Sequence, residues 1–274
     1  MSMKNWFLPS LLATAALLAA VPASAADTAL QAAIAGTQRT PANVLRDPAR
    51  HPYETLSFFG ITPTQTVVEL TPGGGWYTEI LAPYLRERGQ LILAADDPAS
   101  DKAYFQRSAA RLKTKLDASP AVYDKVQVAV FDAGAGKLQY AKPASIDLVV
   151  TFRNVHNWVQ LGDEKTKAVF KSAFDVLKPG GVLGVVEHRR PAAQAQDAKA
   201  ESGYVHQAYV VRMAESAGFK LAATSEVNAN PKDKADHANG VWALPPTYAN
   251  KEVDRARYAA IGESDRMTLK FVKP

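Results

Sequence analysis

Cysteine is absent from the chain of 274 residues. This absence excludes disulfide bonds, thiolate nucleophiles and zinc sites built on cysteine ligands. The excess of positive charge is also small: the formal net charge is +5, and lysine and arginine are spread along the chain without a long run. A basic stripe that could bind a nucleic acid is therefore not expected. Without disulfides the fold must rest on its hydrophobic core, and a chain of this length can form one large domain with such a core.

The N-terminal segment, residues 1–25, has the pattern of a secretory signal peptide. Lys4 supplies a positive charge, residues 8–21 are apolar and rich in Leu and Ala, and residues 23–25 have the small-residue cleavage pattern Ala-Ser-Ala. The apolar run is shorter than the roughly 20 residues of a transmembrane helix, and there is no twin arginine. We expect cleavage after Ala25, a periplasmic or secreted protein, and no membrane span after cleavage. The alternative is an uncleaved N-terminal anchor.

A glycine-rich turn between an apolar run and a helical pattern is the most informative feature. Residues 67–70 are apolar except for Glu69, and residues 71–75 have the sequence Thr-Pro-Gly-Gly-Gly. The apolar positions that follow recur at the spacing of one buried helical face: Tyr77, Ile80, Leu81, Tyr84 and Leu85. Glycines at a strand-to-helix turn allow the backbone to come close to a ligand. The turn therefore predicts a nucleotide-type cofactor site.

Strand and helix patterns alternate through the rest of the chain. Strands are expected at residues 66–70, 90–95, 126–131, 146–151, 182–187, 220–226 and 267–272. Helices are expected at residues 76–86, 102–116, 163–177 and 204–217. This alternation predicts an α/β fold with a doubly wound sheet. Residues 26–60 form an N-terminal lead-in or lid, residues 61–274 the main domain, and residues 228–264 a long loop within it.

Acidic residues stand at the ends of the first three expected strands, namely Glu69, Asp96 and Asp132. In an open α/β sheet, ligands bind beyond the carboxyl ends of the strands. An acid in that place can accept hydrogen bonds from ribose hydroxyls, whereas the alternative is that each acid caps the next helix. Three acids in register with a glycine turn favour the ligand site.

The ordered set of motifs resembles the class I S-adenosylmethionine-dependent methyltransferases. Residues 69–75 are similar to the glycine turn of that family, Asp96 stands where its members hold the ribose, and Asp132 stands where they often keep an acid near the adenine. Residues 177–181 and 217–219 are similar to the turns before its fifth and sixth strands. The resemblance implies a Rossmann-like, mostly parallel sheet of seven strands whose last strand is antiparallel and lies beside the sixth.

The same resemblance implies S-adenosylmethionine as the cofactor. It implies cofactor contacts at Glu69, Thr71, Gly73, Gly75, Asp96, Asp132 and Asn154. Thr71 stands where the family has the first glycine of its turn, which bears on how closely the backbone can approach the methionine part of the cofactor. A nicotinamide-binding Rossmann domain is the nearest rival, but Thr78 occupies the position of its third glycine.

The segment 152–158 follows the fourth expected strand, where the family places acceptor-contacting groups. The Asp/Asn-Pro-Pro-Tyr type of motif found in amino-group methyltransferases is absent, which weighs against nucleic-acid bases and glutamine side chains as acceptors. His156 can act as a general base on a hydroxyl, because histidine ordinarily titrates near neutral pH. We therefore expect a small-molecule acceptor, no nucleic acid, and catalytic roles for His156, Asn157 and Arg153.

Each of these side chains also has a structural alternative. His156 and Asn157 could serve only to hydrogen-bond their loop, and Arg153 could pair with a nearby carboxylate rather than with a substrate anion. His156, Glu187 and His188 could converge on a divalent ion, but no pair of them has metal-ligand spacing. A metal site is therefore not expected.

The expected export opens a second reading of the function. S-adenosylmethionine is made in the cytoplasm, so an exported enzyme has no obvious supply of it. The alternative is an exported, non-enzymatic protein that uses a repurposed methyltransferase fold to bind a small ligand or a partner. The polar residues Arg46, Asp47, Arg50 and His51, just before the first strand, form either a lid that suits an anionic group or a solvated turn.

Overall fold

The computed structural model describes Met1 and residues 27–274, so the expected signal peptide and its cleavage site lie outside the described residues. The strands form one sheet in the order β3-β2-β1-β4-β5-β7-β6. Their bounds are β1 Thr66–Leu70, β2 Gln90–Ala95, β3 Gln127–Val130, β4 Ile146–Phe152, β5 Leu177–His188, β6 Lys220–Ser225 and β7 Arg266–Val272.

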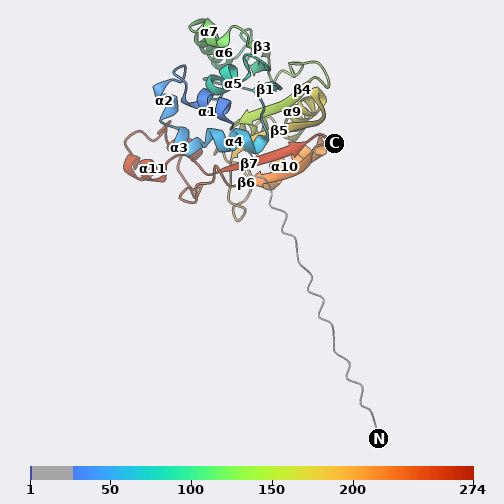
Figure 1. Cartoon of the computed structure of the whole chain (residues 1–274). Helices are drawn as coiled ribbons and strands as arrows, with labels where there is room; N and C mark the ends of the chain where they lie inside the picture. The colour runs from blue at the N-terminus through green and yellow to red at the C-terminus, as the bar shows by residue number, and fades with distance from the viewer. Residues whose placement is uncertain (2–26) are drawn as a thin grey trace.

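The strand order confirms a doubly wound sheet. β1 pairs in parallel with β2 on one side and with β4 on the other, so the winding reverses at β1. β7 runs antiparallel between β5 and β6, which confirms the expected position of the last strand (Figure 1). β1 and β4 are buried along almost their whole length, as apolar central strands of a parallel sheet are.

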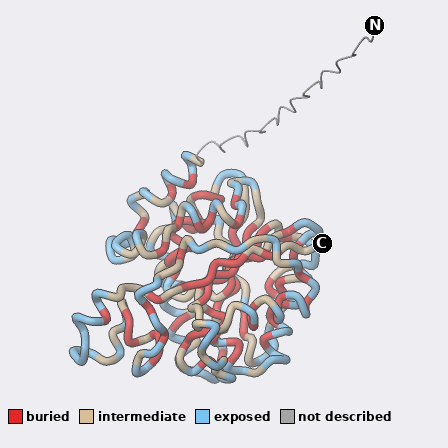
Figure 2. Tube along the Cα trace, turned by 90° about the horizontal axis from the view of Figure 1, so that it is seen from below, coloured by how far each residue is buried: buried red, intermediate tan, exposed pale blue. Residues whose placement is uncertain are grey.

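Helices cover both faces of the sheet. Side chains of α1, α4, α5, α6 and α7 share one hydrophobic cluster with the sheet, and side chains of α8, α9 and α10 share another. The most deeply buried segments run through the middle of the molecule between these layers (Figure 2). The bounds are α1 Thr28–Ala35, α2 Pro41–Val44, α3 Asp47–Arg50, α4 Pro52–Phe59, α5 Thr78–Leu85, α6 Ala103–Asp117, α7 Pro120–Tyr123, α8 Val155–Val159, α9 Asp163–Val176 and α10 Gln207–Ser216.

Several elements differ from the sequence-based expectation. The lead-in contains α1 to α4, and the segment 228–264 contains the 3₁₀ helix η1 Gly240–Ala243 and the helix α11 Arg255–Ile261 rather than one continuous loop. β5 begins at Leu177 instead of residue 182, and α5 begins at Thr78 because the glycine turn continues through Tyr77. The short helices α7 and α8 were missed, because a single turn has too few residues to display a helical period.

The lead-in packs against β5 and against the glycine turn. A Cβ atom at Gly184 of β5 would lie 2.6 Å from the ring of Phe59, so glycine is what allows α4 to come this close. Beside the glycine turn, Nε1 of Trp76 donates to the carbonyl oxygen of Asn43 at 3.0 Å. The guanidinium of Arg39 lies 4.8 Å from the centroid of the Trp76 ring. These contacts hold α2 and the residue Arg39 before it next to the turn.

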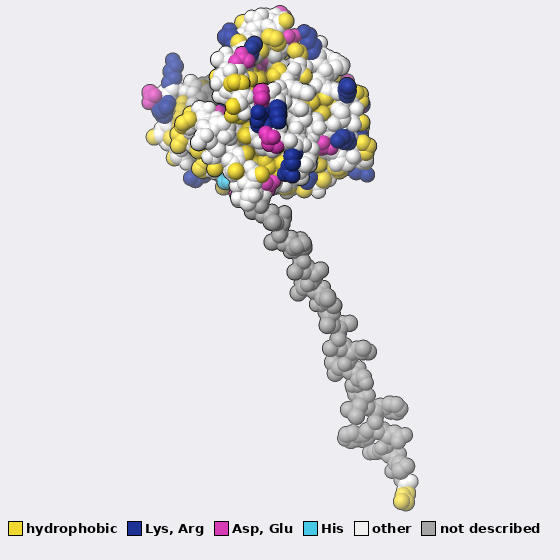
Figure 3. Space-filling view, turned by 45° about the horizontal axis from the view of Figure 1, so that its top comes forward, with side chains coloured by type: hydrophobic (Ala, Val, Ile, Leu, Met, Phe, Trp, Pro, Cys, Tyr) yellow, Lys and Arg dark blue, Asp and Glu magenta, His cyan; other side chains and the backbone are white. Residues whose placement is uncertain are grey.

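The surface and the described helices give two further observations. On the face shown in Figure 3, lysine and arginine side chains lie scattered among acidic and hydrophobic ones, in keeping with the small net charge. Within residues 27–274, no helix combines the length and the apolar character that crossing a membrane requires.

Candidate functional site

A first cavity, of about 360 Å³, opens at the carboxyl ends of the central strands. It is lined by residues that the sequence had singled out: Thr71, Gly73, Asp96, Asp132, Asn154 and Asn157. Aromatic side chains form part of its wall: Tyr104, Phe105, Phe131 and Trp158. The volume lies within the range of roughly 300–1,000 Å³ that small-molecule and cofactor sites occupy.

Asp96 and Asp132 bring two carboxylates into the first cavity. Burial raises the pKa of Asp96, and the nearby charge of Asp132 raises it further. Oδ1 of Asp132 accepts a hydrogen bond from the backbone N–H of Ala135 at 3.0 Å, which fixes the loop after β3. Asp97, the neighbour of Asp96, pairs instead with Lys137. Carboxylates next to aromatic walls fit the ribose hydroxyls and the base of an adenosyl cofactor.

The glycine turn forms the edge of the first cavity. Thr71 has a φ of 53° and Gly73 a φ of 56°, and the left-handed region is unusual for a β-branched residue. The side-chain amide of Asn154 donates to the carbonyl oxygens of Leu70 at 3.1 Å and Thr71 at 3.2 Å. Asn154 thus ties the end of β4 to the turn. A Cβ atom at Gly73 would meet no atom within 4 Å, so the backbone there is open to a ligand.

A second cavity, of about 430 Å³, adjoins the first, and Thr71, Gly73, Asn154 and Asn157 line both. Of the three residues expected to be catalytic, Arg153 and His156 line only the second cavity, and Asn157 lines both. The lead-in and the segment 228–264 close the second cavity with further side chains: Asn43, Arg46, Arg50, Val241, Trp242, Pro245, Pro246, Thr247 and Glu263.

Glu69 and Gly75, two of the expected cofactor contacts, line neither cavity. The side chain of Glu69 is 2% exposed and accepts a hydrogen bond from Oγ1 of Thr78 at 2.7 Å. Burial raises the pKa of Glu69 to about 7, against the opposing effects of Thr78 and Lys115. A Cβ atom at Gly75 would lie 3.2 Å from the Lys115 side chain. Both residues support the turn from its inner side.

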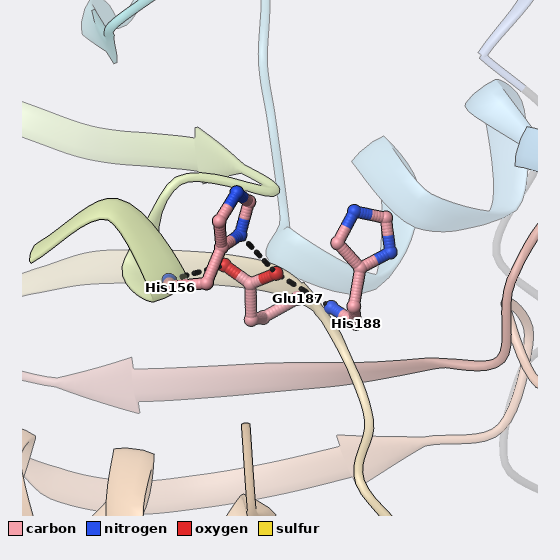
Figure 4. Close-up of side chains that lie close together, drawn as sticks. All are labelled: His156, Glu187 and His188. Atoms are coloured by element: carbon pink, nitrogen blue, oxygen red, sulfur yellow. Dashed lines mark hydrogen bonds and ion pairs between the residues drawn. The ribbon is translucent and has the colours of Figure 1, made fainter. Parts of the chain in front are cut away.

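His156, at the start of α8, lies next to Glu187 and His188 at the end of β5 (Figure 4). Nδ1 of His156 is 3.0 Å from Oε1 of Glu187, and the backbone N–H of His156 donates to Oε2 at 3.2 Å. The backbone N–H of His188 donates to Oε1 at 2.7 Å. Both carboxylate oxygens therefore accept hydrogen bonds, and the imidazole of His156 is fixed at the wall of the second cavity. Sequence reasoning did not give Glu187 this role, although it ends its strand as the other three acids do.

The same three side chains are close enough to hold a metal ion, because their ligand atoms lie within 4.8 Å of one another. Their spacing in the sequence hides this convergence, since His156 follows β4 while Glu187 and His188 end β5. Burial, His156 and Arg153 lower the pKa of His188 well below its ordinary value. The absence of a metal site stays a prediction.

Glu263 gathers arginines beside the second cavity. Its Oε1 accepts from Nε of Arg46 at 2.6 Å, and its Oε2 accepts from Nε of Arg50 at 3.2 Å and from Nη1 of Arg266 at 2.9 Å. Burial alone would raise the pKa of Glu263, but the arginines outweigh it and hold the pKa at about 2. Sequence reasoning missed Glu263, which stands 217 residues after Arg46.

The polar residues before β1 separate into two groups. Arg46 and Arg50 line the second cavity, as a lid would. Asp47 instead pairs with Arg39 at 2.8 Å, and His51 lines neither cavity and links α3 to α4 with a left-handed φ of 43°.

Comparison with known proteins gives one family match and several structural likenesses. Residues 68–185 match the family described as "Methyltransferase domain". Geranyl diphosphate C-methyltransferase from Streptomyces coelicolor A3(2) has a TM-score of 0.55 and 11% identity, over 89% of this chain and 88% of that one. The cyclase SpnF has a TM-score of 0.56 and 15% identity, over 90% of this chain and 92% of that one. A "possible exported protein" from Bordetella parapertussis has a TM-score of 0.50 and 19% identity, over 86% of this chain and 70% of that one.

At these identities the structural likenesses describe the fold alone, which is the Rossmann-like methyltransferase fold. A search among curated proteins gives no match. The family match and the ordered motifs together show that residues 68–185 of the chain form a methyltransferase domain of the S-adenosylmethionine-dependent type. S-adenosylmethionine is accordingly its cofactor, and methyl transfer its class of reaction.

Proposed function

We propose that this protein methylates a hydroxyl group of a small molecule bound in the second cavity, with His156 as the general base. The observation that carries the proposal is the hydrogen bond of 3.0 Å between Nδ1 of His156 and Glu187, at the wall of a cavity that adjoins the one with Asp96 and Asp132. One cavity suits an adenosyl group, and the other offers a base to an acceptor.

The residues of the chain divide the work between the two cavities. Asp96 and Asp132 would hold the adenosyl part of S-adenosylmethionine, which would supply an electrophilic methyl group when it is bound. Methyl transfer to oxygen then asks the protein for in-line positioning and for removal of one proton. Thr71 and Asn154 line both cavities, so an acceptor in the second cavity would approach a cofactor in the first beside these two residues.

Glu187 sets the imidazole of His156 for this task. A carboxylate beside Nδ1 favours the tautomer in which Nδ1 carries the proton, so that Nε2 is the basic atom. The second hydrogen bond, from the backbone N–H of His156 to Oε2 of Glu187, fixes the backbone of α8 relative to β5. The carboxylate also stabilises the imidazolium that forms when Nε2 takes the acceptor proton.

The proposal includes export, with cleavage after Ala25. It is supported by the signal-peptide pattern of residues 1–25 and by the likeness to a "possible exported protein". The N-terminal sequence of the protein purified from a periplasmic fraction tests it: the chain should begin at Ala26, and an intact N-terminus on a membrane-bound chain would contradict cleavage.

Thermal unfolding with S-adenosylhomocysteine tests the cofactor site. Ligand at 100 times its dissociation constant should add about 2.7 kcal/mol of stability, which for a domain of this size raises the midpoint by roughly 5–10 °C. Radiolabelled methyl transfer from S-adenosylmethionine to a panel of hydroxylated acceptors follows. No shift at millimolar ligand would favour an exported, repurposed fold instead, whereas a shift without transfer to any hydroxyl would overturn the acceptor assignment.

A further inference from the structure

The wall of the second cavity carries an excess of positive charge. Arg46, Arg50 and Arg153 line it, and the single carboxylate among them is that of Glu263. Arg266, which also binds Glu263, lies directly behind. Four guanidinium groups thus share one carboxylate in a buried region, and within residues 27–274 the Arg153 side chain forms no salt bridge that would neutralise it.

Arg50 is the residue that most needs a partner. Its side chain is 2% exposed, and its Nε donates to Glu263 at 3.2 Å. Its two terminal nitrogens, Nη1 and Nη2, are buried and have no hydrogen-bond partner among the described residues. Buried donors are almost always satisfied, because an unpaired one costs about 1–3 kcal/mol and more when it is charged.

Packing holds the Arg50 guanidinium in its place. Its Cζ atom lies 4.7 Å from the centroid of the Trp76 ring, on the glycine turn. Burial lowers the pKa of Arg50, and the charge of Arg153 lowers it further. The pKa of Arg153 itself is lowered to about 10, first by its own burial. Both guanidinium groups would regain stability from an anion placed between them.

We infer that the acceptor carries an anionic group, a carboxylate or a phosphate, that binds to Nη1 and Nη2 of Arg50 and to the guanidinium of Arg153 in the second cavity. Guanidinium groups bind the oxygens of such anions with two parallel hydrogen bonds. The inference rests on the proposed function, because it defines the substrate class of the same site: a hydroxylated anion with its hydroxyl toward His156.

The positive wall also decides between an anion and a cation. His156, Glu187 and His188 could ligate a metal by distance alone. Both oxygens of Glu187 accept hydrogen bonds within the protein, and Arg153 lines the same cavity. Electrostatic repulsion from the arginines therefore opposes a cation here and favours an anion.

Three matched aromatic probes test the inference: benzoate, phenyl phosphate and the uncharged benzamide. Aromatic side chains of the cavity, among them Trp76, Phe152 and Trp242, suit the common ring. The protein, expressed from the full chain, is titrated with each probe by calorimetry at constant ionic strength, with and without S-adenosylhomocysteine. We expect at least one of the two anions to bind tenfold or more tightly than benzamide. The stronger anion identifies the source as a carboxylate or a phosphate.

Arginine variants make the test specific to this site. Arg50→Gln and Arg153→Gln should each weaken the binding of the anion by tenfold or more and leave the affinity for benzamide unchanged. Arg212→Gln, an exposed arginine on α10 outside the cavity, should bind like the wild type. Equal affinity for benzamide and both anions, or unchanged anion affinity in Arg153→Gln, would overturn the inference. If Arg50→Gln does not fold, Arg153→Gln decides alone.

S-adenosylhomocysteine is titrated into the same proteins as a separate readout. Its binding to the wild type bears on the proposed function, whereas the contrast between anions and benzamide bears on the arginine site. A protein that binds S-adenosylhomocysteine but does not prefer anions would retain the proposed function and lose this inference. A protein that prefers anions but does not bind S-adenosylhomocysteine would support the anion site and contradict the proposed function.

Discussion

Nδ1 of His156 lies 3.0 Å from Oε1 of Glu187, and the backbone N–H of His156 donates to the other oxygen of the same carboxylate. One side chain at the end of β5 therefore fixes both the ring and the backbone of a residue that follows β4. Because β4 and β5 are parallel neighbours in the sheet, their carboxyl ends meet at one edge. A base that is held this way needs little reorganisation to accept a proton.

Replacing His156 with alanine should slow methyl transfer strongly and spare cofactor binding. A positioned general base contributes about 10²–10⁴-fold to a rate, so kcat should fall by that factor while the Kd for S-adenosylhomocysteine stays within twofold. Glu187→Gln keeps an acceptor for Nδ1 but removes the charge, and should lower kcat less. Steady-state kinetics and calorimetry measure both. Full turnover in His156→Ala would remove this residue from the base role.

Asp96 is expected to hold the ribose of the cofactor. Loss of a hydrogen bond to a charged group costs roughly 1.5–3 kcal/mol. Asp96→Ala should therefore weaken the binding of S-adenosylhomocysteine about 10- to 150-fold. Asp101→Ala, at an exposed position outside the first cavity, serves as the control and should bind normally. Calorimetric titration gives both constants. Equal affinities in the two variants would mean that Asp96 does not contact the cofactor.

The sequence predicts the sheet and the first cavity better than the second cavity, for a physical reason. The first cavity is built by short segments directly after strands, where Gly73, Asp96 and Asp132 follow local apolar patterns. The second is closed by contacts between distant parts of the chain, as between Arg46 and Glu263, 217 residues apart. Such contacts follow from tertiary packing, and no local period encodes them. Asp96 could thus be named from its strand, whereas Glu263 could not.

Glu69 illustrates the limit of what the glycine-turn motif predicts. Its position before the glycine turn matches the pattern, yet its side chain points into the interior and meets Thr78. Successive side chains of a strand alternate between its two sides, so the place of an acid at a strand end does not fix the direction of its carboxylate. The structure shows that the Glu69 carboxylate points into the interior, where burial raises its pKa.

Stability should fall with rising pH because of Glu69. Its pKa rises from 4.5 to about 7 in the folded protein, so the folded state binds the proton more tightly than the unfolded state does. The associated stability is fully present below pH 4.5 and is lost as the pH rises through 7, with a total of about 3 kcal/mol.

Urea unfolding between pH 5 and 9 measures this effect. Glu69→Gln keeps an acceptor for Thr78 but cannot ionise, so its free energy of unfolding should lack that decline and exceed the wild-type value above pH 7. Glu54→Gln, at an exposed acid on α4, should follow the wild-type curve. Parallel curves for Glu69→Gln and the wild type would mean that the carboxylate ionises in the fold as it does in the unfolded chain.

Replacing Thr71 with glycine should stabilise the folded protein. Its φ of 53° is strained for a β-branched residue, at a cost of about 1–3 kcal/mol, whereas added glycine entropy in the unfolded chain costs only about 0.4–1 kcal/mol. Thr71→Gly should therefore raise the free energy of unfolding by up to about 2 kcal/mol. Thr64→Gly, at an exposed threonine without a positive φ, should lower it by about 0.4–1 kcal/mol. Equal losses in both variants, measured by urea unfolding, would show that Thr71 carries no strain.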